Sequence, residues 1–134
     1  MEATASEVTT LRSQEDIVLA RQIARTWAVK LGFSLVDQTK IVTATSELAR
    51  NAVVHGGGGQ MHVDLVANGI RRGLRLTFAD QGPGIPDLQL ALKDGYTSGN
   101  GMGLGLSGSR RLMNDFHIES TVGAGTRVVV TKWK

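Results

Sequence analysis

The fold is decided by residues 61–80, which read MHVDLVANGIRRGLRLTFAD. Apolar and mostly polar residues alternate over 61–67, as in a strand with one buried face, and a second alternating run covers 74–78. Asn68-Gly69 between the two runs is typical of a turn. We therefore expect two antiparallel strands, joined as a β-hairpin, at the centre of the chain.

Two helices are expected before this hairpin. Ser13–Asp16 has the spacing of a capping box, with aspartate in place of the usual glutamate, and Ser34–Asp37 repeats that spacing. Glycines at 32 and 56 are placed to end the helices. The apolar stripes at helical spacing are Ile17, Ala20, Ala24, Trp27 and Leu31 in the first helix, and Ile41, Ala44, Leu48 and Ala52 in the second.

The remaining elements complete a layered fold. We expect a short strand at 8–12, one or two helical turns at 87–93, a loop at 94–103, a helix over 104–114, and strands over 116–121 and 126–133. In the order β-α-α-β-β-α-β-β, strands form hairpins rather than alternating with helices. This order predicts an α+β fold, a two-layer sandwich with helices on one face of a mixed, mostly antiparallel sheet. Residues 1–134 are expected to form a single domain.

Composition narrows the classes of function. The chain has no cysteine, which excludes disulfides, and its three histidines (His55, His62 and His117) lack metal-ligand spacing. The net charge of +3 is mild and does not require a nucleic-acid partner. No apolar run approaches the roughly 20 residues of a membrane span, and the first residues do not form a signal peptide. We therefore expect a cytoplasmic protein that binds neither nucleic acid nor membrane.

Glu47 and Asn51 are the first candidate site residues. They are four positions apart on the second predicted helix, which places them on one face and roughly 6 Å apart along the axis. A carboxylate can accept a proton from an attacking hydroxyl or water, and a carboxamide oxygen is a suitable ligand for Mg²⁺. The same spacing is common on solvated helix faces. The pair alone therefore does not distinguish a site from an ordinary polar stripe.

Asp80 is the second candidate, at the end of an apolar strand and before Gln81-Gly82-Pro83-Gly84. Its carboxylate can accept a hydrogen bond from an exocyclic amine such as that of adenine. Gly82 and Gly84 would let the backbone turn tightly under a planar ring. An ordinary glycine-rich turn has the same composition, so this motif is also ambiguous by itself.

The third candidate is the glycine-rich stretch that precedes the third predicted helix. Gly101, Gly103 and Gly105 would expose backbone N–H groups at a helix start, where phosphates bind. Gly103, Gly105 and Gly108 also match a dinucleotide-binding pattern, but no strand precedes them and no acidic residue follows at the required distance. A phosphate-binding loop of a different kind is the better interpretation.

Taken together, these motifs resemble those of the GHKL ATP-binding fold, which is shared by gyrase-type ATPases, Hsp90, sensor histidine kinases and MutL. Glu47-x-x-x-Asn51 resembles the N box, Asp80-x-Gly82-x-Gly84 the G1 box, and Gly101-x-Gly103-x-Gly105 the G2 box. Thr126 resembles the threonine that pairs with the G1 aspartate at adenine. The resemblance implies that ATP is bound by Asn51, Asp80, Gly82, Gly84, Gly101, Gly103, Gly105 and Thr126. It further implies that Asn51 holds Mg²⁺ and that Glu47 accepts the proton of the attacking hydroxyl.

The subfamily follows from what surrounds the motifs. About 35 residues precede the second helix, and they hold no histidine, whereas a sensor histidine kinase carries its phosphorylated histidine on a preceding helix pair. Ser46–Asn51, Asp80–Pro86 and Gly105–Asn114 look most like the RsbT-type switch kinases of the bacterial stressosome. Kinases of that type phosphorylate serine or threonine on STAS-domain antagonists and then activate a PP2C-type phosphatase. The resemblance implies the same activity and partners here, and it allows a homodimer.

Three alternatives remain open from the sequence. The chain resembles the anti-sigma kinases, which bind a sigma factor directly, although those of the sporulation type carry an arginine just before Gly-Met-Gly. Here the matching stretch is Ser98-Gly99-Asn100, without a cation. The chain could also be a non-catalytic switch that uses nucleotide only to change partners, or an ATPase without a protein substrate.

Overall fold

The computed structural model describes residues 2–85, 92 and 106–134. Its sheet has five strands in the spatial order β1-β2-β3-β5-β4, and every described pairing is antiparallel. The strands are β1 (Glu2–Leu11), β2 (Gly59–Asn68), β3 (Arg71–Asp80), β4 (Asp115–Thr121) and β5 (Gly125–Trp133). β2 and β3 form the hairpin expected at residues 61–80, with Met61 opposite Phe78.

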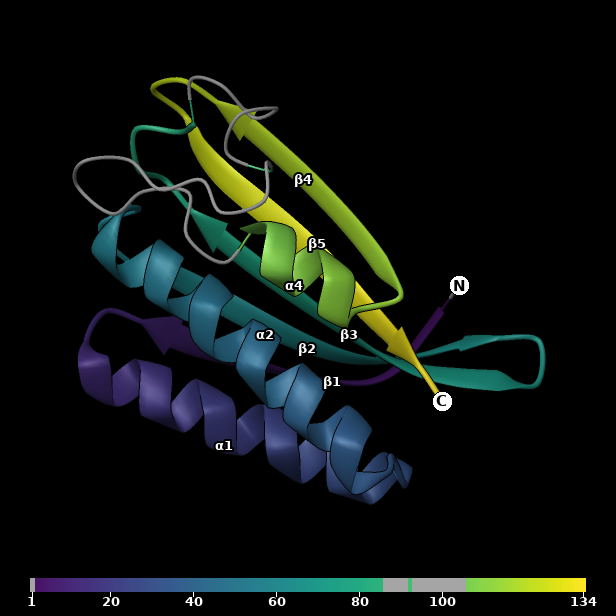
Figure 1. The fold of residues 1–134 in the computed structure, drawn as a ribbon. Coiled ribbons are helices and arrows are strands. Elements are labelled where there is room, and N and C mark those ends of the chain that lie inside the picture. The colour runs from purple at the N-terminus through teal and green to yellow at the C-terminus, as the bar shows by residue number, and fades with distance from the viewer. Residues whose placement is uncertain (1, 86–91, 93–105) are drawn as a thin grey trace.

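The helices lie on one side of this sheet (Figure 1). They are α1 (Gln14–Leu31), α2 (Leu35–Val54) and α4 (Leu106–Leu112). α1 and α2 pack together over β1, β2 and β3, and α4 contacts α2. The predicted α+β two-layer architecture and its element order are therefore confirmed.

Both long helices begin where the capping pattern predicts. The Ser13 hydroxyl accepts the N–H of Asp16, and the Ser34 hydroxyl accepts the N–H of Asp37. The Asp16 carboxylate accepts the N–H of Arg12 at 2.8 Å, so the acid reaches back one residue further than in a standard capping box. At the other end of α1, Gly32 adopts the left-handed conformation that ends many helices.

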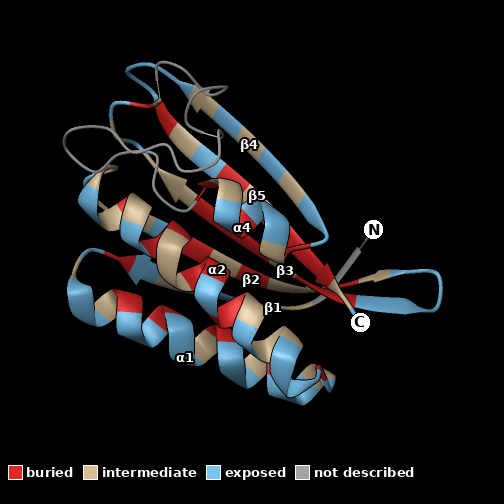
Figure 2. Cartoon of the chain, in the orientation of Figure 1, coloured by how far each residue is buried: buried red, intermediate tan, exposed pale blue. Residues whose placement is uncertain are grey.

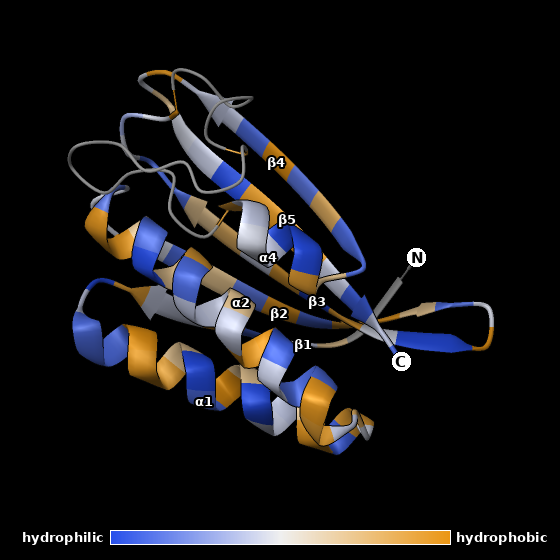
Figure 3. Cartoon of the chain, in the orientation of Figure 1, coloured by the Kyte–Doolittle hydropathy of each residue, from blue (hydrophilic) through white to orange (hydrophobic). Residues whose placement is uncertain are grey.

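The core lies between the helices and the sheet. The predicted stripe of α2 is buried throughout, and that of α1 is buried at Ile17, Ala20 and Ala24, whereas Trp27 and Leu31 are only partly buried (Figure 2). On the sheet, Leu74, Leu76 and Phe78 of β3 are buried in this core. Alternation of polar and apolar residues is clearest on β4, whose apolar residues pack against the core (Figure 3). The second face of the sheet carries no described helix.

Some boundaries differ from those expected. β1 starts at Glu2 rather than near residue 8, because its polar first half pairs with β2 across a register shift between Ala3 and Ala5. Within 106–114, the helix ends at Leu112, since Met113 and Asn114 lead into β4. The turns expected at 87–93 and the loop expected at 94–103 lie outside the described residues, Leu92 excepted. Among the described helices, none combines the length and apolar character needed to cross a membrane.

Candidate functional site

A small cavity of about 40 Å³ lies where α2 meets the ends of β3 and β5. We call it the α2–β3 cavity. Its polar lining consists of Asn51, His55, Asp80 and Thr126. Its apolar lining consists of Leu48, Ala52, Phe78, Ile85, Leu106 and Val128. Mostly apolar walls with a few convergent polar groups are the usual lining of a ligand site.

Asp80 is fixed at the rim of this cavity by its own turn. The N–H of Gly82 donates to the Asp80 carboxylate at 3.0 Å, and Asp80 lies directly opposite Thr126 in the ladder between β3 and β5. Burial raises the pKa of Asp80, while the backbone N–H groups of Gly82 and Thr126 act in the opposite direction. The carboxyl group is thus held in place while partly removed from water, as expected of a group that must accept a ligand hydrogen bond.

Gly56 makes room for this carboxyl group. A Cβ on Gly56 would overlap Cγ of Asp80, and a Cβ on Gly82 would lie 2.6 Å from Cα of Gly56. Both distances are too short for two carbon atoms that are not bonded, so neither position has room for a side chain. The end of α2 and the turn after β3 therefore pack backbone against backbone, with the Asp80 carboxyl group directly over Gly56.

Gly125 allows a similarly close approach between β5 and the backbone of Asp80. Its φ is +107°, and an added Cβ would overlap the backbone oxygen of Asp80. Only glycine combines that conformation with so close an approach. The close contact between the two strands sets Thr126 beside Asp80 at the rim of the cavity.

α2 supplies the other polar groups. Asn51 and His55, one turn apart, both line the cavity, and Nε2 of His55 is buried without a hydrogen-bond partner among the described residues. Glu47 lies one turn before Asn51 and is half-buried, but it does not line the cavity. The helix thus places Asn51 at the cavity and Glu47 beyond it, along the same row.

Ser120 of β4 joins three parts of the site. Its hydroxyl oxygen accepts the N–H of Ile85 at 2.7 Å, and it lies 2.8 Å from Oγ1 of Thr126, its register partner on β5. The backbone oxygen of Gly125 is 3.3 Å away. The Ser120 hydroxyl on β4 therefore connects the turn after Asp80 with the hydroxyl of Thr126 through hydrogen bonds.

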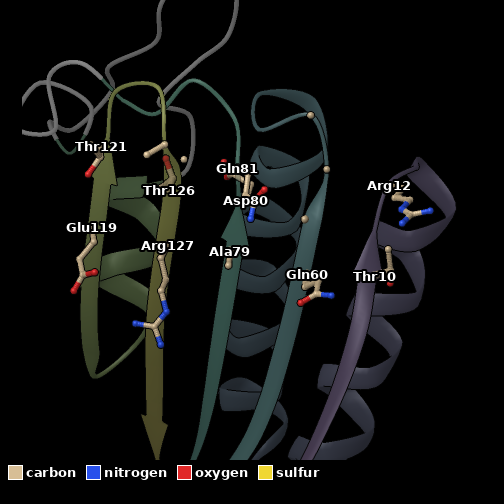
Figure 4. A pocket seen from close by; sticks show the side chains of 15 residues that line it. Thr10, Arg12, Gln60, Ala79, Asp80, Gln81, Glu119, Thr121, Thr126 and Arg127 are labelled. Carbon is tan, nitrogen blue, oxygen red and sulfur yellow. The ribbon is translucent and has the colours of Figure 1, made fainter.

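A wider groove of about 840 Å³ opens on the other face of the same sheet end (Figure 4). Asp80 and Thr126 stand at the ends of neighbouring strands there, and Glu119 and Arg127 lie further along β4 and β5. This groove is larger than the α2–β3 cavity, but it is open and polar and lacks the apolar walls that would hold a planar ring. We therefore place the candidate site in the α2–β3 cavity.

The structure brings together most of the described candidates from the sequence. Asn51, Asp80, Gly84 and Thr126 line the cavity, and Gly82 holds the Asp80 carboxylate. Gly101, Gly103 and Gly105 lie outside the described residues.

Sequence reasoning missed Gly56, His55 and Ser120. Glycine-rich composition at 56–59 was a signal for the first. The position of His55, four residues after Asn51, was a signal for the second. For Ser120 the sequence offers no comparable signal, because Ile85, which donates to its hydroxyl, is 35 residues away.

The donor set limits which metals the site can hold by itself. No group of three or more His, Cys, Asp or Glu side chains in the described part of the chain is arranged to bind a metal ion. A single carboxamide oxygen at the cavity, that of Asn51, fits Mg²⁺, which usually keeps several waters and binds through one or two protein ligands plus substrate phosphates. The donors therefore fit a Mg²⁺ ion that arrives with a nucleotide.

Comparison with known proteins agrees with this geometry. The family described as histidine kinase-, DNA gyrase B-, and HSP90-like ATPase matches residues 36–134. The chain is 45% identical to the serine/threonine-protein kinase RsbT of Bacillus subtilis over 123 residues. This alignment covers 92% of each of the two chains. It is 30% identical over 118 residues to an anti-sigma F factor of Bacillus licheniformis, which covers 84% of this chain and 81% of that protein.

A solved structure shares the fold. The crystal structure of the RsbU and RsbW domains of a Mycobacterium tuberculosis protein superposes with a TM-score of 0.69 at 23% identity, over 98% of this chain and 33% of that one. At this level of identity the likeness concerns the fold alone. The sequence matches extend further: the chain belongs to the histidine kinase-, DNA gyrase B- and HSP90-like ATPase family and, within it, to the group of the serine/threonine-protein kinase RsbT.

Proposed function

We propose that residues 1–134 act as one ATP-dependent serine/threonine protein kinase domain of a bacterial partner-switching pathway, with adenine bound in the α2–β3 cavity. The observation that carries this proposal is the pairing of Asp80 with Thr126 at the rim of an apolar cavity that Asn51 also lines. A carboxylate acceptor beside a hydroxyl suits the amine and ring nitrogen of adenine. The similarity to RsbT supports a protein hydroxyl as the phosphate acceptor.

The proposed reaction transfers the γ-phosphoryl group of ATP to a serine or threonine hydroxyl. The hydroxyl oxygen forms a bond to the γ-phosphorus, the bond from that phosphorus to the β-phosphate bridging oxygen breaks, and ADP leaves. Glu47 takes the proton of the hydroxyl. Most of the rate enhancement comes from positioning and electrostatics, as is usual for phosphoryl transfer.

The order of side chains along α2 supports these roles. Asn51 is at the cavity, and Glu47 lies one turn before it in the helix, outside the cavity lining. Reacting groups belong away from the adenine end of the nucleotide, so the position of Glu47 outside the cavity lining supports its proposed role as the base. Gly101, Gly103 and Gly105 are proposed to close over the phosphates.

Magnesium is proposed to be held by Asn51 together with the nucleotide phosphates. When bound, Mg²⁺ offsets negative charge on the phosphates. Asn51 contributes a neutral oxygen ligand and helps to orient the triphosphate relative to Glu47. A variant that lacks this oxygen should lose more ATP affinity in the presence of Mg²⁺ than in EDTA, relative to the wild-type protein.

The proposed partners are STAS-domain proteins as substrates and a PP2C-type phosphatase as the target activated afterwards, in the cytoplasm. The similarity over 92% of RsbT supports this assignment. In the test, the purified chain is incubated with γ-labelled ATP, Mg²⁺ and a candidate STAS protein, and the modified residue is identified by mass spectrometry. We expect label on a serine or threonine of the STAS protein. Absence of label, together with ATP hydrolysis at the same rate with and without the STAS protein, would contradict the kinase assignment.

A second candidate is an anti-sigma factor that binds a sigma factor directly. Identity of 30% to an anti-sigma F factor over 84% of the chain favours it. Co-purification with a sigma factor in the presence of ATP would support this second function. Co-purification with a STAS protein or a phosphatase alone would support the first.

A further inference from the structure

The hydroxyl of Ser120 has more neighbours than it has protons to give. It accepts the N–H of Ile85, which can only donate, so this contact fixes one lone pair of the Ser120 oxygen. The single proton of Ser120 then has two candidate acceptors. One is Oγ1 of Thr126 at 2.8 Å, and the other is the backbone oxygen of Gly125 at 3.3 Å.

The two acceptors differ in their distance from Ser120. Hydrogen bonds between oxygens have donor–acceptor distances of about 2.5–3.0 Å, so Thr126 lies in the favourable range and Gly125 does not. Either oxygen can be the donor of the 2.8 Å bond, and donation by Ser120 uses the shorter of its two contacts. A donated bond at one end of a hydroxyl chain also strengthens the next bond in the same direction, which makes the order Ile85, Ser120, Thr126 self-consistent.

This order sets the polarity of Thr126. When Thr126 accepts the proton of Ser120, its own proton remains to be donated. Thr126 lines the α2–β3 cavity beside Asp80, so the cavity rim presents one acceptor and one donor next to each other. Adenine offers the complementary pair, an exocyclic amine beside the ring nitrogen N1. Guanine offers the reverse, an oxygen beside a ring N–H.

We propose that Ser120 is a positioning residue that determines nucleotide specificity, because it holds the Thr126 hydroxyl as a donor toward N1 of adenine. The inference rests on the proposed binding of ATP in the α2–β3 cavity. Ser120 itself does not line the cavity, so it acts through Thr126 and through the turn that contains Ile85.

The inference is tested with ATP and 1-deaza-ATP, in which carbon replaces N1. Their dissociation constants are measured by calorimetry for the wild-type protein and for Ser120→Ala, Ser120→Thr, Thr126→Val and the double variant Ser120→Ala/Thr126→Val. In the wild type we expect ATP to bind roughly 3- to 10-fold more tightly than 1-deaza-ATP, the value of one net hydrogen bond. Ser120→Ala should shrink this preference toward unity, and Ser120→Thr, which keeps a hydroxyl, should retain it.

The double variant separates action through Thr126 from independent action. If Ser120 works through Thr126, the preference for ATP in the double variant equals that in Thr126→Val alone. His117→Gln is the control, since His117 is an exposed side chain on β4 that pairs with Glu119, away from the cavity. It should leave both dissociation constants unchanged. Thr126→Val also keeps the bond between Ser120 and Ile85, so it provides the test even where Ser120→Ala does not fold.

Two results would overturn the inference alone. One is a wild-type preference for ATP that persists in Ser120→Ala or in Thr126→Val. The other is a loss in the double variant that equals the product of the single losses. Failure of the wild-type protein to bind ATP at all would instead overturn the proposed function, and the inference with it.

Discussion

At the scale of single residues, we predict that nucleotide recognition depends on Asp80. Asp80→Asn keeps the shape of the side chain and an oxygen for the N–H of Gly82, but it replaces the other acceptor oxygen by a donor NH₂ group at the proposed position of the adenine amine. A hydrogen bond to a charged group is worth about 1.5–3 kcal/mol, so we expect ATP affinity to fall roughly 10- to 150-fold. Calorimetric titration with ATP measures this change. Affinity within twofold of the wild type would remove Asp80 from the site.

The same substitution has a pH-dependent effect on stability. Because burial raises the pKa of Asp80 in the folded protein, the native state binds the proton more tightly than the unfolded chain. The stability that this proton contributes is fully present below the unfolded pKa of about 3.9 and is lost as the pH rises through the higher folded pKa. The uncharged asparagine side chain carries no such penalty, so the melting temperature of Asp80→Asn relative to wild type should be more favourable at pH 7 than at pH 4. A difference that is equal at both values, or smaller at pH 7, would contradict the raised pKa.

Gly56 is predicted to control the position of the Asp80 carboxyl group. In Gly56→Ala the new methyl group would overlap Cγ of Asp80, so the carboxyl group must move and ATP affinity should fall by roughly tenfold or more, the value of a hydrogen bond to a charged group. Gly108→Ala is the matched control, since a Cβ there meets nothing within 4 Å. The control should bind ATP as the wild type does and should be more stable by up to about 1 kcal/mol, because alanine replaces glycine in a helix. Equal ATP affinity in both variants would contradict the steric argument.

Sequence alone predicted the described acceptor groups but not what orients them. Asp80 and Asn51 were predictable, because each is a polar residue at a fixed offset from an apolar pattern. Ser120 could not be predicted, since on β4 it is one of several alternating polar residues, and its importance depends on a turn 35 residues away. His55 was discounted for lack of metal-ligand spacing, although its position four residues after Asn51 puts it on the same helix face as Glu47 and Asn51.

At the scale of elements, a buried lysine links the helices to the sheet. Lys132 of β5 is 7% exposed, donates to the backbone oxygen of Leu112 at the end of α4, and lies 3.8 Å from the carboxylate of Asp37 near the start of α2. A cation at a helix end also interacts favourably with the helix dipole. Lys132 therefore fixes the position of α4, the helix that follows the glycine-rich segment in the sequence.

Lys132→Met should therefore destabilise the protein. The backbone oxygen of Leu112 would lose its donor in a partly buried place, at a cost of about 1–3 kcal/mol in the free energy of unfolding. Urea denaturation followed by circular dichroism measures this cost. Lys134→Met, at an exposed position two residues later, should change it by less than about 0.5 kcal/mol. If Lys132→Met proved as stable as the control, the link would have no energetic role.

Element boundaries were predictable where local chemistry sets them. The caps at Ser13 and Ser34 and the stop at Gly32 are local signals, and the structure confirms all three. The start of β1 was not predictable, because residues 2–7 have little apolar alternation and form a strand only through pairing with β2. Trp27 follows the helical period yet stays partly exposed, since its ring N–H donates to the carboxylate of Glu7 on β1.

At the scale of the whole molecule, the order of elements decided the architecture. Strands that follow one another in hairpins must lie side by side, so two predicted hairpins and three helices leave few arrangements other than helices on one face of an antiparallel sheet. The position of β5 between β3 and β4 was not derivable in this way. That crossover is what sets Thr126 beside Asp80 and creates the cavity. A homodimer, which the sequence resemblance allows, stays a prediction.

We propose, as the central claim, that this molecule holds ATP in the α2–β3 cavity and that Glu47 accepts the proton of a protein hydroxyl. Its most direct test compares wild type with Glu47→Gln in two measurements, ATP affinity and the single-turnover rate of phosphoryl transfer to a STAS-domain partner. We predict that ATP affinity stays within about twofold while the transfer rate falls by roughly 10²- to 10⁴-fold, the contribution typical of a general base. Transfer at the wild-type rate by Glu47→Gln, with ATP bound equally well, would contradict the claim.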